Sequence, residues 1–181
     1  MRINVQEEVD GLEAIYKGWD LIEKRESEIG KKKTQIIELE TKINAFLKEA
    51  DSCQRELNAC NSSDSFSVIG SLMSKAGKAK DNADKLQAQA DELRSEVRAY
   101  ELNIAKTVQG LVEVAEKIAS SAREKKQLIA TALREAPDDS ELEKRLLDFD
   151  NTLNMAIFAS SHTLKALNTK KNTSDSEWGD N

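Results

Sequence analysis

Apolar residues recur at alternating intervals of three and four positions between Ala83 and Ala132. Twelve of the fifteen positions in this series are apolar, although only 39% of the whole chain is hydrophobic. A spacing of 3.5 residues kept over seven heptads predicts one long helix of a coiled coil. The series consists of Ala83, Leu86, Ala90, Leu93, Val97, Tyr100, Ile104, Thr107, Leu111, Val114, Ile118, Ser121, Lys125, Leu128 and Ala132.

The pattern predicts three helices, at about residues 4–60, 67–135 and 139–170. The loops between them are expected at about 61–66, which is rich in serine and asparagine, and at 136–139, which contains the only proline. In the first helix the apolar series is regular only from Ile36 onward. Before that it reads Val5, Val9, Leu12, Tyr16 and Trp19, and it slips at Ile22 and Ile29.

Glycines interrupt the first helix at positions 11, 18 and 30. Each one costs about 1 kcal/mol relative to alanine in a helix interior. We therefore expect this part of the helix to bend or fray.

The width of the apolar stripe changes along the central helix. A second apolar row accompanies the first only from Leu102 onward: Leu102, Ala105, Val108, Val112, Ala115, Ala119, Ala122, Ile129 and Leu133. A narrow seam serves one neighbouring helix, whereas a wider face requires two. The expected fold is therefore all-α: an elongated antiparallel helical hairpin, or coiled coil, with a shorter third helix packed on its base. Residues 1–171 would form this single bundle, with a three-helix base and a two-helix arm, and residues 172–181 a disordered acidic tail.

The composition argues against several classes of function but does not identify one. The net charge of −6 argues against nucleic acid as a partner, because such binding needs clustered basic residues. The three lysines at 31–33 are surrounded by glutamates and are expected to be a solvated face. His162 is the only histidine, and no glycine-rich phosphate loop or Cys-x-x-Cys motif is present. We therefore expect no catalytic residues, no metal, no cofactor and no small-molecule substrate.

No apolar run approaches the ~18 residues of a membrane-spanning helix, and the N-terminal residues lack the profile of a signal peptide. These features favour a cytoplasmic protein. The sequence Tyr-Lys-Gly-Trp-Asp at 16–20 resembles the Tyr-x-x-x-Asp export signal of WXG-type secreted helical hairpins, so export by a non-classical route stays open. That family has Trp-x-Gly in the turn between its helices, and the turn expected here at about 62–65 has none. The likeness therefore does not assign a family.

The expected tip of the hairpin combines apolar and basic residues. Its lysines are at positions 75, 78 and 80. These side chains could cap the hairpin, dock on a protein or touch a membrane surface. The apolar residues of the tip are Phe66, Val68, Ile69, Leu72 and Met73.

Two other segments are candidates for binding a partner. Met155 and Phe158 belong to a stretch of the third helix that is apolar on all sides, which indicates either a deeper bundle or contact with another chain. Trp178 stands among acidic residues near the C-terminus and is either a short docking peptide or incidental.

The function expected from these features is that of a non-enzymatic coiled-coil interaction protein: an adaptor, an assembly chaperone or a structural subunit. It would bind a partner protein, or a second copy of itself, through the tip, the third helix or the tail. The alternative is a membrane-active helical protein, of pore-forming or membrane-remodelling type, whose tip contacts lipid.

Overall fold

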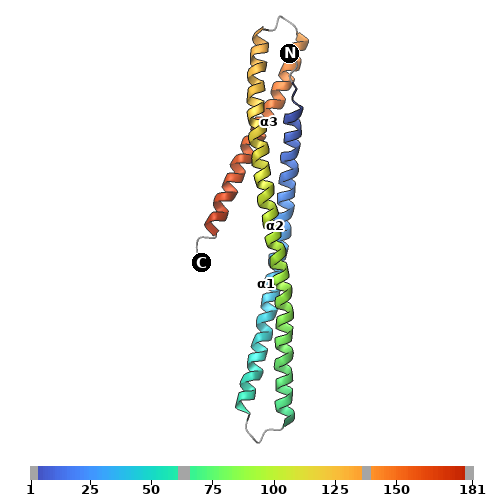
Figure 1. The fold of residues 1–181 in the computed structure, drawn as a ribbon, viewed down its shortest axis with the longest axis vertical. Coiled ribbons are helices and arrows are strands. Elements are labelled where there is room, and N and C mark those ends of the chain that lie inside the picture. The colour runs from blue at the N-terminus through green and yellow to red at the C-terminus, as the bar shows by residue number, and fades with distance from the viewer. Residues whose placement is uncertain (1–3, 61–65, 136–139, 178–181) are drawn as a thin grey trace. The chain divides into compact units, whose positions relative to one another are not determined.

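The computed structural model describes residues 4–60, 66–135 and 140–177, apart from the side chains of 140, 142 and 170–177. The described residues form three helices and no strand (Figure 1). They are α1 (Gln6–Ala59), α2 (Phe66–Glu135) and α3 (Ser140–Glu177). The predicted all-α fold, with two long helices and a shorter third helix packed on them, is confirmed.

Helix α3 continues to Glu177, past the end expected near residue 170. Residues 172–177, expected to be part of the tail, are thus included in the helix. Polar composition alone does not end a helix, and the first glycine or proline after Lys171 is Gly179. Residues 61–65 and 136–139 of the two expected loops, and Trp178 of the tail, lie outside the described residues.

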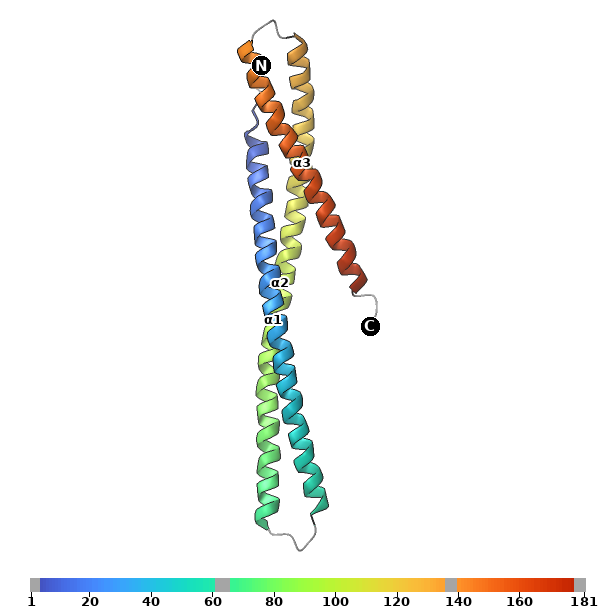
Figure 2. The same cartoon turned by 180° about the vertical axis from the view of Figure 1, so that it is seen from behind.

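The chain divides into two compact units. The three-helix unit consists of Met1–Lys24 and Asn103–Asn181, and the two-helix unit consists of Arg25–Leu102. Within each unit α1 and α2 run antiparallel, and α3 belongs to the three-helix unit alone (Figures 1 and 2). On α2 the division falls next to Leu102, where the second apolar row begins. The wider apolar stripe of α2 thus lies in the unit that contains the third helix.

The core of the three-helix unit consists of two clusters that each draw on α2 and α3. In the first, Ile15 and Ile22 of α1 pack with α2 residues around Ala115 and with Leu167 of α3. In the second, Ala122 and Ile129 of α2 pack with Leu146 and Leu153 of α3. The second apolar row of α2 supplies several of the buried residues, namely Ala115, Ala119, Ala122 and Ile129.

The seam of α1 differs from the stripe expected in its first turns. Val9 and Tyr16 are exposed, and seven of the buried positions follow a strict seven-residue repeat. The spacing of seven is kept from the first residue to the last. The repeat is hard to recognise in the sequence because its first residue is charged. It consists of Glu8, Ile15, Ile22, Ile29, Ile36, Ile43 and Ala50.

Glu8 is fully buried and paired. Its Oε1 accepts a hydrogen bond from Ser121 Oγ at 2.6 Å, and Lys125 Nζ lies 2.8 Å from both carboxylate oxygens. Ser121 and Lys125 are two of the three polar interruptions in the apolar series of α2. Two of the polar residues in the apolar series of α2 therefore pair with the buried carboxylate of Glu8.

Two glycines of α1 allow close approach to α2. A Cβ atom on Gly11 would lie 2.3 Å from Ile118 Cγ2, and one on Gly18 would lie 2.5 Å from Leu111 Cδ2. Both distances are shorter than real carbon contacts, so a side chain at either position would force the facing residue of α2 to move. Helix α1 is unbroken through Gly11, Gly18 and Gly30, so the fraying that we expected there is not observed.

Replacing Gly11 with alanine is expected to destabilise the protein, although alanine is normally favoured in a helix. The gain in helix propensity is about 1 kcal/mol, and overpacking against the β-branched Ile118 typically costs about 1–3 kcal/mol. Gly30→Ala is the matched control, because its Cβ would meet nothing within 4 Å, and it should stabilise the protein. Urea denaturation followed by circular dichroism measures both free energies of unfolding. Stabilisation of similar size by both variants would contradict the close approach.

Replacing Lys125 with methionine is expected to lower the free energy of unfolding by about 3 kcal/mol, because it leaves the Glu8 carboxylate buried without its cation. The double variant Glu8→Met with Lys125→Met should recover most of this loss, because a buried ion pair is replaced by apolar side chains of similar length. The same denaturation measurement tests both. A double variant that is no more stable than Lys125→Met would show that the pair does not act as a unit.

Candidate functional site

Each helix of the two-helix unit contributes one main buried row, and Cys53 of α1 and Ala79 of α2 are also buried. The α1 row consists of Ile29, Ile36, Ile43 and Ala50, and the α2 row consists of Ala76, Ala83, Ala90 and Val97. Both rows repeat every seven residues. Alanine fills three of the four α2 positions, and small side chains allow two helix backbones to approach closely.

Ion pairs join the two helices on one face of this helical pair. The residues that form these pairs each come four positions after a buried residue, and they are Lys33, Glu40, Arg94 and Glu101. Lys33 Nζ lies 3.4 Å from a carboxylate oxygen of Glu101. Arg94 donates a hydrogen bond to Glu40 and another to Asp91, and these bonds raise the pKa of its guanidinium.

Large apolar side chains line the opposite face and are only half-buried. They come three positions after a buried residue, and in an antiparallel pair these positions turn to the same side of both helices. The row consists of Leu39 and Phe46 on α1 and Leu86, Leu93 and Tyr100 on α2. The largest side chains of the two-helix seam therefore lie where water reaches them.

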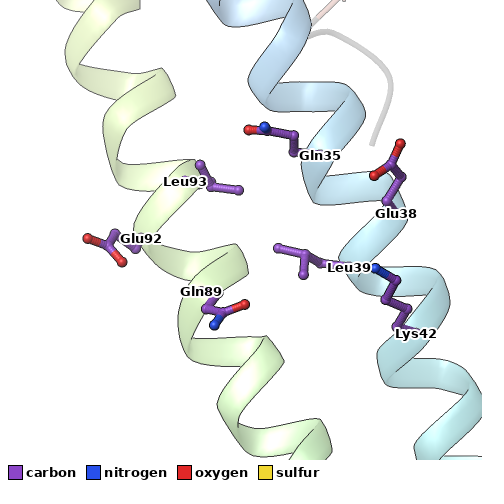
Figure 3. A pocket seen from close by; sticks show the side chains of 7 residues that line it. All are labelled: Gln35, Glu38, Leu39, Lys42, Gln89, Glu92 and Leu93. Carbon is purple, nitrogen blue, oxygen red and sulfur yellow. The ribbon is translucent and has the colours of Figure 1, made fainter.

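A hollow of about 350 Å³ lies on this face. Leu39 and Leu93 point toward each other across its floor (Figure 3). We call this hollow the leucine groove. Its other lining residues are polar: Gln35, Glu38, Lys42, Gln89 and Glu92.

Cations cover the row beyond the groove, at Tyr100. The guanidinium carbon of Arg25 lies 4.6 Å from the centre of the Tyr100 ring, and Lys32 Nζ lies 5.7 Å from it. Lys32 also donates a hydrogen bond to Glu96, which raises the pKa of the ammonium group. Arg25 pairs in turn with Glu28 at 2.7 Å. Two cations thus lie over the ring of Tyr100.

The apolar residues predicted at the tip divide into two groups. Phe66 is 94% exposed, and Val68 and Met73 are also exposed. Ile69 and Leu72 are half-buried and precede the buried Ala76 on the inner side of α2. The exposed group, which we call the tip patch, consists of Phe66, Val68 and Met73.

The two candidates on α3 both face outward. Met155 is 61% exposed and Phe158 is 74% exposed. The Phe158 ring stacks on His162 of the same helix, with ring centres 6.4 Å apart. The core side of α3 is formed by other residues, with Leu153, Ala156 and Ser160 fully buried. The apolar stretch of α3 therefore has some side chains packed inside the unit and others exposed on its surface.

The leucine groove was not predicted from the sequence. The two alternating positions of each heptad look like a single seam in the sequence, although their side chains differ in size. On α2 between residues 83 and 100, the fully buried position is mostly alanine and the other position is Leu86, Leu93 or Tyr100. That alternation of small and large residues is a signal for a close pair whose large side chains lie to one side.

Within the described part of the chain, no group of three or more His, Cys, Asp or Glu side chains is placed to hold a metal ion. None of the helices described is both long and apolar enough to cross a membrane. In comparisons with protein-family models, with curated proteins and with solved structures, nothing matches this chain.

Proposed function

We propose that this chain is a non-enzymatic, cytoplasmic interaction protein, an adaptor, assembly chaperone or structural subunit, that binds a helix of a partner protein along the leucine groove. The observation that carries the proposal is the difference between the two faces of the two-helix unit. One face is joined by the pairs Lys33–Glu101 and Arg94–Glu40, and the other leaves Leu39 and Leu93 half-buried.

A third helix is the occupant that such a face favours. A helix that presents apolar residues at spacings of three and four can lay them in a groove between two other helices. Such a helix would complete the burial of Leu39 and Leu93, and its flanking polar residues would meet Gln35 and Gln89 at the rim. Burying the rest of two leucines and the facing apolar side chains is worth roughly 25 cal/mol per Å² of area removed from water.

A photoreactive phenylalanine analogue tests which face binds. Placed at Gln89 on the groove rim, it is expected to crosslink a partner protein in extracts of the native source. Placed at Gln87, two residues away on α2, it should crosslink little or nothing, because that side is the face joined by ion pairs. Equal crosslinking from both positions would contradict the proposal.

A substitution provides the matched control. Leu39→Asp should abolish crosslinking from position 89, because a charged side chain in the groove floor cannot be buried without a partner. Ile37→Asp removes an exposed apolar side chain from the same helix outside the groove and should have no effect. Circular dichroism verifies that both variants keep their helix content. Crosslinking that survives Leu39→Asp would place the partner elsewhere.

The tip patch supports a second candidate function, contact with an anionic membrane surface. Phe66 is almost fully exposed, and residues 66–80 contain three lysines and no acidic residue. Exposed apolar side chains with neighbouring lysines are typical of interfacial binding, and each lysine near an anionic surface contributes about 1 kcal/mol.

Flotation with lipid vesicles tests this candidate. The protein should float with vesicles of phosphatidylserine and phosphatidylcholine and not with phosphatidylcholine alone. The double variant Phe66→Ser with Met73→Ser should lose flotation, because both side chains leave the patch. Ile37→Ser, which removes an exposed apolar residue elsewhere in the same unit, should not. Absence of flotation with the anionic vesicles would exclude membrane contact through the tip patch.

A further inference from the structure

Helix α3 carries two rows of residues with heptad spacing, one on each side. The inner row is part of the core of the three-helix unit and includes Leu146, Leu153, Ala156 and Leu167. The outer row is the inner one shifted by two positions, which turns it about 200° around the helix axis. Its residues from 148 to 165 are all exposed: Asp148, Asn151, Met155, Phe158, His162 and Lys165.

Residues at equal distances from the centre of the outer row are chemically complementary. Met155 and Phe158 form an apolar middle. Asn151 and His162 flank them with hydrogen-bonding groups, and Asp148 and Lys165 stand at the two ends with opposite charges. When such a row is turned end to end, acid meets base and apolar meets apolar.

We propose that the outer row of α3 binds the same row of a second copy of this chain, with the two helices antiparallel. The spacing then places three kinds of layer in register, each occurring twice because of the two-fold axis. Met155 lies opposite Phe158 of the second copy, Asn151 lies opposite His162, and Asp148 lies opposite Lys165. The two-fold axis passes between the apolar layers.

The antiparallel arrangement is favoured over a parallel one by charge. A parallel pair would set Asp148 against Asp148 and Lys165 against Lys165, and like charges across a seam repel. The antiparallel pair replaces both repulsions with attraction. It also sets an imidazole, which can donate a hydrogen bond, against an amide oxygen that can accept one.

The apolar centre gives the pairing its affinity, and the ends give it direction. Methionine sulfur makes favourable contacts with aromatic rings, and Phe158 already presents its ring outward, beside His162. Because the apolar centre has only two layers, we expect dimerisation that depends on protein concentration. This pairing uses the three-helix unit and does not rest on the leucine groove.

Sedimentation equilibrium of the purified full-length protein tests the pairing. The wild-type chain should show a monomer–dimer equilibrium, and Phe158→Ser should be monomeric over the same concentrations. Phe66→Ser is the matched control, because it removes another strongly exposed phenylalanine, and it should dimerise like the wild type. A wild-type chain that is monomeric at every concentration would overturn the proposal, as would dimerisation that is unaffected by Phe158→Ser.

Charge exchange tests the orientation. Lys165→Asp sets two carboxylates against each other at both ends of the pair and should weaken dimerisation by about tenfold or more, as loss and reversal of two ion pairs implies. Asp148→Lys should weaken it similarly. The double exchange Asp148→Lys with Lys165→Asp restores opposite charges and should return the affinity to near the wild-type value. A double exchange as weak as the single ones would overturn the antiparallel register, because it would show that these two positions do not face each other.

Discussion

The antiparallel register of α1 and α2 is the constraint on which the other features depend. In the three-helix unit it places Ser121 and Lys125 at Glu8, and it places Ile118 and Leu111 over the two glycines. In the two-helix unit it aligns Lys33 with Glu101 and Leu39 with Leu93. A slip of one heptad would move each residue about 10 Å along its neighbour. It would leave Glu8 buried without a cation, which is far more costly than the loss of an exposed ion pair.

The packing that buries one row of each helix also leaves other apolar side chains of that helix facing solvent. Alanine on the buried row of α2 brings the helices of the two-helix unit together, and the leucine and aromatic side chains of the neighbouring heptad position then lie on one side of the seam. In α3 the inner row fills the three-helix core, so Met155 and Phe158, two positions along from inner-row residues, face solvent. A helix with apolar residues on two sides can bury only one of them in its own unit. This is why the candidate binding surfaces are rows along helices and not enclosed pockets.

The sequence predicted the fold class well because helix pairing leaves a simple periodic trace. The second apolar row of α2 begins at Leu102, next to the boundary of the unit that contains the third helix. The seam of α1 was harder to find, because Glu8 occupies a buried position and only its partners on α2 explain why. Gly11 and Gly18 looked like weak points of a helix, and their role is visible only once Ile118 and Leu111 are placed against them. The leucine groove was missed because spacing shows which positions form a seam but not how deeply each position is buried.

Distances between paired spin labels, measured by double electron–electron resonance, test this register most directly. One label would replace Glu38 on the groove rim, and the other would be placed in turn at Lys85, Glu92 and Ala99, one heptad apart on α2. The register described here predicts the shortest distance for Glu92, with the other two pairs longer by a similar amount. A shortest distance at Lys85 or Ala99 would contradict it.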